Sequence, residues 1–185
     1  MNARVAKILQ YNEVFVDNEL YLKYTTSKYP DRKIAILSCM DTRMTQLLPA
    51  ALGLKNGDVK MITNAGALLT HPCGSGIYSL LVAIYELDVD TIMVVGHDDC
   101  GGKALNGVEI VEKMRARGVT QDALDHAAEH FMPVEEWMTG FGDVEHSVQH
   151  TVEIIANHGL IPKEIEVFGF VMDPETGLLR AVKND

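Results

Sequence analysis

Short apolar runs alternate with helical segments along this 185-residue chain, and this alternation constrains the fold more than any other feature. Residues 33–38, 59–63, 91–95 and 165–171 are short and apolar, as buried strands are. Strands that alternate with helices indicate βαβ units and a parallel sheet covered on both faces. The sequence therefore predicts a three-layer α/β fold with a mainly parallel sheet of about four strands.

The two ends of the chain add to this prediction. An apolar helical pattern predicts one helix over residues 3–28, within an N-terminal helical arm of residues 1–30. Residues 173–177 place Pro and Gly as a turn requires, so residues 178–182 are expected to form an antiparallel edge strand at the C-terminus. No repeat or linker divides the sequence, and residues 1–185 are expected to form a single domain.

Composition limits the partners and the compartment. The formal net charge is −10, which disfavours nucleic acid and anionic membranes as partners. No apolar run approaches the roughly 18 residues that a membrane span needs, and the N-terminus has no signal-peptide core, so we expect a cytoplasmic protein. Three cysteines do not make a disulfide framework in a chain of this length. Each cysteine therefore needs another role.

Two cysteines and a histidine follow predicted strands. Cys39 comes after the first strand, His97 after the third, and Cys100 three residues later. The carboxyl ends of parallel strands form the ligand-binding edge of such sheets, so these side chains can meet there. Three Cys and His ligands with one open position are typical of catalytic zinc sites. The pattern predicts one Zn²⁺ per chain; the alternative is two buried thiols and a hydrogen-bonded core histidine.

Asp41 and Arg43 lie beside this predicted site. Alternate residues of an extended segment point the same way, so the two side chains can form a bidentate ion pair that keeps the carboxylate ionised. We predict that both are catalytic, with Asp41 an acceptor beside the open zinc position. Asp41 is also the one nearby oxygen that could become a fourth metal ligand. The alternative is an ordinary surface ion pair.

These motifs resemble those of the β-class carbonic anhydrases. The family pattern Cys-x-Asp-x-Arg matches residues 39–43, and His-x-x-Cys matches residues 97–100. Asn64-Ala65-Gly66 matches a third family element. The resemblance covers about residues 33–105 and resumes weakly at 165–179. Thr63 departs from the pattern, because many members have Arg there.

The resemblance implies the activity and the roles of the site residues. It implies Zn²⁺ on Cys39, His97 and Cys100, and reversible hydration of CO₂ to bicarbonate and a proton by a zinc-bound hydroxide. Asp41 would accept a hydrogen bond from that hydroxide while Arg43 holds Asp41 off the metal. In some members the matching aspartate occupies the fourth zinc position instead.

The resemblance also implies a homodimer or a larger homo-oligomer, with the N-terminal helices packing on the partner. Two alternatives to carbonic anhydrase activity remain open. One is a related zinc hydrolase or lyase acting on another small substrate, such as carbon disulfide. The other is a non-catalytic zinc-binding regulator.

A second histidine pair is expected to be inert. His126 and His130 match the His-x-x-Glu-His pattern of one class of zinc peptidases and would share a helix face. The segment is acidic and polar, and the sequence offers no third ligand outside it. We predict a solvated helix face here.

Overall fold

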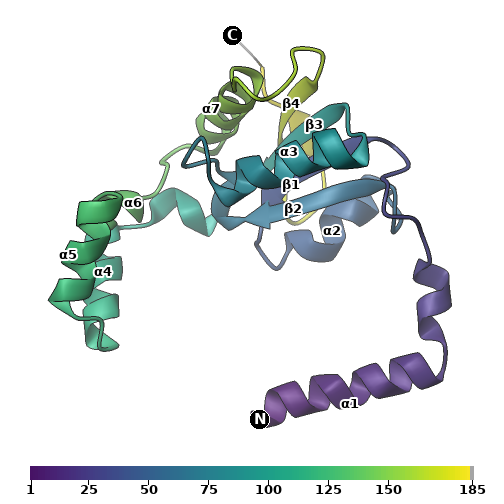
Figure 1. Cartoon of the computed structure of the whole chain (residues 1–185), viewed down its shortest axis with the longest axis horizontal. Helices are drawn as coiled ribbons and strands as arrows, with labels where there is room; N and C mark the ends of the chain where they lie inside the picture. Colours follow the sequence, from purple (N-terminus) through teal and green to yellow (C-terminus); the bar gives the residue numbers. More distant parts are fainter. Residues whose placement is uncertain (184–185) are drawn as a thin grey trace.

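The structure is a computed structural model that describes residues 1–183. A five-stranded sheet forms the centre of the molecule (Figure 1). Its strands are β1 (Ile34–Cys39), β2 (Val59–Asn64), β3 (Thr91–His97), β4 (Glu166–Met172) and β5 (Leu179–Ala181). Their order is β2-β1-β3-β4-β5. The first four strands are parallel and β5 is antiparallel to β4, which confirms the predicted α/β sheet with its C-terminal edge strand.

Helices α2 (Met44–Ala51), α3 (Ser75–Leu87) and α7 (Val144–Ala156) cover the two faces of the sheet. The other helices of the described residues are α1 (Ala3–Asp17), α4 (Gly107–Ala116), α5 (Gln121–His130) and α6 (Val134–Trp137). Successive side chains of a strand point to opposite faces. Ala35 and Leu37 of β1 accordingly pack with α3 and α7, whereas Ile36 packs with α2 on the other face. The result is three layers, with the sheet between α2 on one side and α3 and α7 on the other.

Two segments lie outside these layers (Figure 1). Helices α4, α5 and α6 form a small unit with its own core of Val111, Leu124 and Val134. The N-terminal arm, α1 and a 3₁₀ turn at Leu20–Tyr24, extends away from the sheet and buries none of its residues. Among the described residues, no helix is both long and apolar enough to cross a membrane.

The arm differs from the sequence prediction in one respect. The apolar pattern suggested one helix over residues 3–28, but α1 ends at Asp17. Glu19 adopts a left-handed backbone conformation, with φ of 53°, and the 3₁₀ turn follows it. A helix cannot continue through a left-handed residue, so the apolar periodicity of this segment overestimated the helix length.

We predict that Leu48→Ala lowers the free energy of unfolding by about 2–5 kcal/mol. Leu48 of α2 is fully buried against β1 and β3, so truncation removes apolar contacts and leaves a cavity. Chemical denaturation followed by circular dichroism measures the change. Leu160→Ala is the matched control, because Leu160 is 60% exposed and should change stability by less than about 0.5 kcal/mol. Equal losses in the two variants would contradict the assigned layer of α2.

Candidate metal centre

Two neighbouring strands bring the predicted ligands together. Cys39 is the last residue of β1, and His97 is the last residue of β3, which pairs in parallel with β1. The chain then turns sharply, helped by a left-handed Asp99, and returns Cys100 to the same edge. The ligand atoms of Cys39, His97 and Cys100 all lie within 4.8 Å of one another, and all three residues are buried.

The spacing of the two sulfur atoms fits a metal ion. Cys39 Sγ and Cys100 Sγ are 3.8 Å apart, and both cysteines are free. A disulfide would require about 2.05 Å. Two sulfurs, each about 2.3 Å from a tetrahedral zinc ion, lie about 3.8 Å apart. The thiol pair therefore has the separation that two zinc ligands need.

His97 presents a free lone pair to the same point. Its Nδ1 lies 2.8 Å from the carbonyl oxygen of Asp98. A carbonyl can only accept, so Nδ1 carries the proton and the neutral ring keeps a lone pair on Nε2. Nε2 is buried and has no hydrogen-bond partner within the described part of the chain. A buried imidazole nitrogen without a partner is costly unless a metal ion or another group occupies the space before it. The donor set thus fits a metal ion.

The two thiols differ in acidity. Burial raises the pKa of Cys39, but the neighbouring His97 ring and the backbone N–H groups of Gly66 and Asp41 outweigh burial and lower this pKa to about 7. Burial raises the pKa of Cys100 to about 11. A bound cation would favour the thiolate of both residues.

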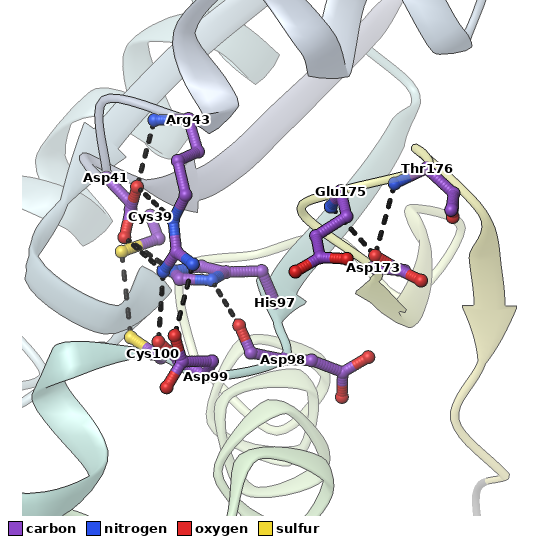
Figure 2. A network of polar contacts seen from close by, with 10 residues as sticks. All are labelled: Cys39, Asp41, Arg43, His97, Asp98, Asp99, Cys100, Asp173, Glu175 and Thr176. Atoms are coloured by element: carbon purple, nitrogen blue, oxygen red, sulfur yellow. Dashed lines mark hydrogen bonds and ion pairs between the residues drawn. The ribbon is translucent and has the colours of Figure 1, made fainter.

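The predicted ion pair of Asp41 and Arg43 lies beside the cluster, and Figure 2 shows its contacts. Arg43 Nε donates to Asp41 Oδ1 at 3.1 Å, and Arg43 Nη2 donates to Asp41 Oδ2 at 2.9 Å. This bidentate contact lowers the pKa of Asp41 to about 2, so the carboxylate is ionised at neutral pH. Asp41 Oδ2 lies 3.7 Å from His97 Nε2. Asp41 does not belong to the cluster of three ligand atoms, and its coordination of metal stays a prediction.

A small cavity opens beside the cluster. Its volume is about 440 Å³, and Met40, Ala65, Gly66, Gly102 and Leu105 contribute to its walls together with the two cysteines. Most of this lining is apolar. Such walls suit a small uncharged molecule.

The structure adds residues that the sequence did not single out. Arg43 also donates to the carboxylate and the carbonyl oxygen of Asp99, at 3.1 and 3.0 Å. A β-carbon on Gly66 or Gly102 would lie within 3 Å of a ring atom of Phe141, so this ring packs closely on the loops beside the cluster. Neither contact has a local sequence signal, because the partners are 56, 75 and 39 positions apart.

A second cluster lies on α5, far along the chain from the first. The ligand atoms of His126, Glu129 and His130 are within 4.8 Å of one another, so Glu129 joins the histidine pair. All three residues are exposed, and His130 Nδ1 donates to the backbone carbonyl of His126. The structure thus shows a solvated helix face here, without the burial and the partnerless nitrogen of the first cluster.

The similarity of the chain to known proteins now defines its family. Residues 34–179 match the family model described as carbonic anhydrase. A Bacillus subtilis protein named "Putative carbonic anhydrase YvdA" is 47% identical, over 100% of this chain and 94% of its own length. The chain therefore belongs to the β-carbonic anhydrase family, as its motifs indicated.

Two further relatives extend the comparison. The crystal structure of β-carbonic anhydrase isoform I of Trichomonas vaginalis superposes with a TM-score of 0.88, at 28% identity, and covers 100% of this chain and 99% of that one. A carbon disulfide hydrolase of Acidithiobacillus thiooxidans is 28% identical over 81% of this chain and 77% of its own length. The family thus includes relatives named for two different small substrates.

We predict that Cys39→Ser and Cys100→Ser weaken zinc binding by more than about tenfold, because each removes a thiolate while nearly preserving side-chain size. Cys73→Ser is the matched control, since Cys73 is exposed and outside the cluster. Metal analysis after dialysis against a defined free zinc concentration measures the stoichiometry. Zinc retained at the wild-type level by Cys39→Ser would show that the thiol pair is not the metal site.

Proposed function

We propose that the protein catalyses the reversible hydration of CO₂ to bicarbonate and a proton. The observation that carries this proposal is the ionised Asp41 carboxylate, held by Arg43 on both oxygens, 3.7 Å from the partnerless nitrogen of His97. A purely structural metal site has no need of a fixed acceptor beside its ligands. Membership of the carbonic anhydrase family supports the same reaction.

The metal in this proposal is one Zn²⁺ per chain, held by Cys39, His97 and Cys100. The family consists of zinc enzymes, and the sulfur separation of 3.8 Å fits a tetrahedral zinc ion. When bound, zinc supplies Lewis acidity that lowers the pKa of a water molecule and makes it nucleophilic near neutral pH. With three protein ligands rather than four, Cys39, His97 and Cys100 would leave such an ion open to a further small ligand.

Asp41 and Arg43 direct the nucleophile. The Asp41 carboxylate has a pKa of about 2 because of Arg43, so at neutral pH it can only accept hydrogen bonds. The carboxylate accepts a hydrogen bond from the O–H group of the attacking water. This hydrogen bond orients a lone pair of the water oxygen toward the carbon of CO₂. Arg43 fixes the direction of the carboxylate and holds it away from the metal. Asp41 is thus the catalytic residue, and Arg43 acts through it.

The cavity beside the cluster supports a small neutral substrate. CO₂ is linear and apolar, and the mostly apolar walls around Met40, Gly66 and Leu105 can desolvate it at little cost. The product bicarbonate is an anion, and such a lining retains it weakly. Water then displaces it, and the proton passes to solvent.

Carbon disulfide hydrolysis is the second candidate function, because a relative 28% identical to this chain is named for it. The same groups would serve, since CS₂ is also linear, apolar and attacked at carbon. A non-catalytic zinc-binding role is the third possibility, and the Asp41–Arg43 pair argues against it. Sulfide release from CS₂ and bicarbonate formation from CO₂, measured on one zinc-loaded preparation, separate the three.

We further propose that the protein is a cytoplasmic homodimer or larger homo-oligomer, with the N-terminal arm covered by another copy. The arm buries no residue within its own chain, although Ile8 is 67% and Leu22 is 60% exposed. The exposed apolar side chains of α1 and the 3₁₀ turn, here called the apolar row, would lose contact with water if a second copy packed on the arm. In a symmetric dimer the arms of the two copies would cover each other's apolar rows.

We predict that Asp41→Asn lowers kcat/KM for CO₂ hydration by at least about 10²-fold while one zinc per chain remains bound. The amide loses the charge and presents a donor where the carboxylate only accepted. Stopped-flow hydration assays and metal analysis on the same sample give both quantities. Asp58→Asn is the matched control, because Asp58 forms a similar pair with Arg32 at 3.1 Å before β2, at the opposite end of the sheet. An unchanged rate in Asp41→Asn would remove Asp41 from the mechanism.

We also predict that Ile8→Asp shifts the protein toward monomers by placing a charge on the covered face of the arm. Sedimentation velocity over a range of concentrations measures the distribution. Lys7→Asp is the control, a neighbouring exposed change that inserts no charge into the apolar row. A wild-type protein that is monomeric at all concentrations would contradict the oligomer proposal.

A further inference from the structure

Two arginines bind the loop at residues 97–100, which carries two of the three proposed ligands. Arg43 binds the carboxylate and the carbonyl oxygen of Asp99, as Figure 2 shows. Arg180 binds the carboxylate of Asp98. The role of Arg43 follows from its pairing with Asp41, whereas nothing in the proposed reaction yet uses Arg180.

Arg180 makes a well-formed bidentate contact. Its Nη1 donates to Asp98 Oδ2 at 2.8 Å, and its Nη2 donates to Asp98 Oδ1 at 2.9 Å. Two parallel hydrogen bonds of this kind fix the orientation of a carboxylate as well as its position. Arg180 is the middle residue of β5 and lies opposite Val171 of β4, so the sheet holds its backbone in register.

Asp98 connects this arginine to the metal cluster. Its backbone N–H donates to the carbonyl oxygen of Met172 at 2.9 Å, and its own carbonyl accepts from His97 Nδ1 at 2.8 Å. The second bond sets both the tautomer of His97 and the plane of its ring. A rotation of the Asp98 peptide would turn this acceptor away and leave the imidazole without its orienting partner.

We propose that Arg180 is a positioning residue for the metal centre: it holds Asp98 so that the Asp98 carbonyl orients His97 toward the metal. This inference rests on the proposed zinc site. The chain of contacts runs from the edge strand β5, through the Asp98 carboxylate and backbone, to His97 Nδ1. Outer partners of metal-binding histidines usually change metal affinity by 10–100-fold when removed. Arg180 acts through an intermediate residue, so we expect the lower end of that range.

A simple surface ion pair is the competing explanation. The side chains of Arg180 and Asp98 are 42% and 45% exposed, and exposed pairs contribute little to stability. Arg180 also lies in the field of Glu145 and Asp173, which offer it other partners. The two explanations differ in a measurable way. A surface pair would affect only the attachment of β5, whereas a positioning residue would change metal binding through Asp98.

The test compares zinc affinities of the full-length protein in a competition titration with a chromophoric chelator. Arg180→Gln should bind zinc about tenfold more weakly than wild type. Arg32→Gln is the matched control, because Arg32 lies before β1, remote from the cluster, and its half-exposed side chain pairs with Asp58 at 3.1 Å. It should bind zinc as wild type does. Thermal unfolding of the metal-free variants checks that both are folded.

A double-mutant cycle identifies the route of the effect. If Arg180 acts through Asp98, Arg180→Gln should cause no further loss of zinc affinity in an Asp98→Asn background. The visible spectrum of the Co²⁺-substituted protein should also change in Arg180→Gln and not in Arg32→Gln, because the band depends on ligand geometry. An unchanged affinity in Arg180→Gln, or an equal loss in the Asp98→Asn background, would overturn the inference.

The outcomes also separate this inference from the proposed function. A wild-type protein that binds zinc and hydrates CO₂, with an Arg180→Gln variant of equal affinity, removes only the role of Arg180. A wild-type protein that binds no zinc removes both.

Discussion

The parallel pairing of β1 with β3 is the constraint on which the rest of the site depends. Ser38 lies beside Val95, and each strand ends within two residues of that pair, at Cys39 and at His97. Two residues 58 positions apart in sequence therefore meet at one edge of the sheet. The turn that follows returns Cys100 to the same point, and burial excludes water from all three side chains. The ligand cluster is thus a consequence of strand order.

Charge organises the region around that cluster. Three aspartates lie within three positions of Cys39, His97 or Cys100, and two arginines bind all three: Arg43 binds Asp41 and Asp99, and Arg180 binds Asp98. The Arg43–Asp41 pair fixes the Asp41 carboxylate, and the other two pairs both hold the loop that carries His97 and Cys100. Because Arg43 binds both oxygens of Asp41, the carboxylate is stabilised without a metal ion, as its proposed role as an acceptor requires.

Much of this arrangement could be predicted from the sequence. The apolar runs identified all four parallel strands, and the residues after them identified the cluster and the Asp41–Arg43 pair. The remainder depends on contacts that no local pattern encodes. Arg180 reaches Asp98 across 82 positions because β5 folds back on β4, and a short edge strand gives no sign of which side chain it presents. The prediction of one helix over residues 3–28 was wrong because the apolar pattern continues past Glu19, whereas the left-handed backbone of Glu19 does not allow the helix to continue.

The most direct test of the account is the rate of CO₂ hydration by the purified protein, followed by stopped flow at known zinc content. The account predicts one zinc per chain and a rate that rises in proportion to bound zinc, is lost on chelation and returns when zinc is restored. A protein that holds one zinc per chain and hydrates CO₂ no faster than buffer would contradict it. In that case the metal cluster would stand, and the substrate assigned to it would be wrong.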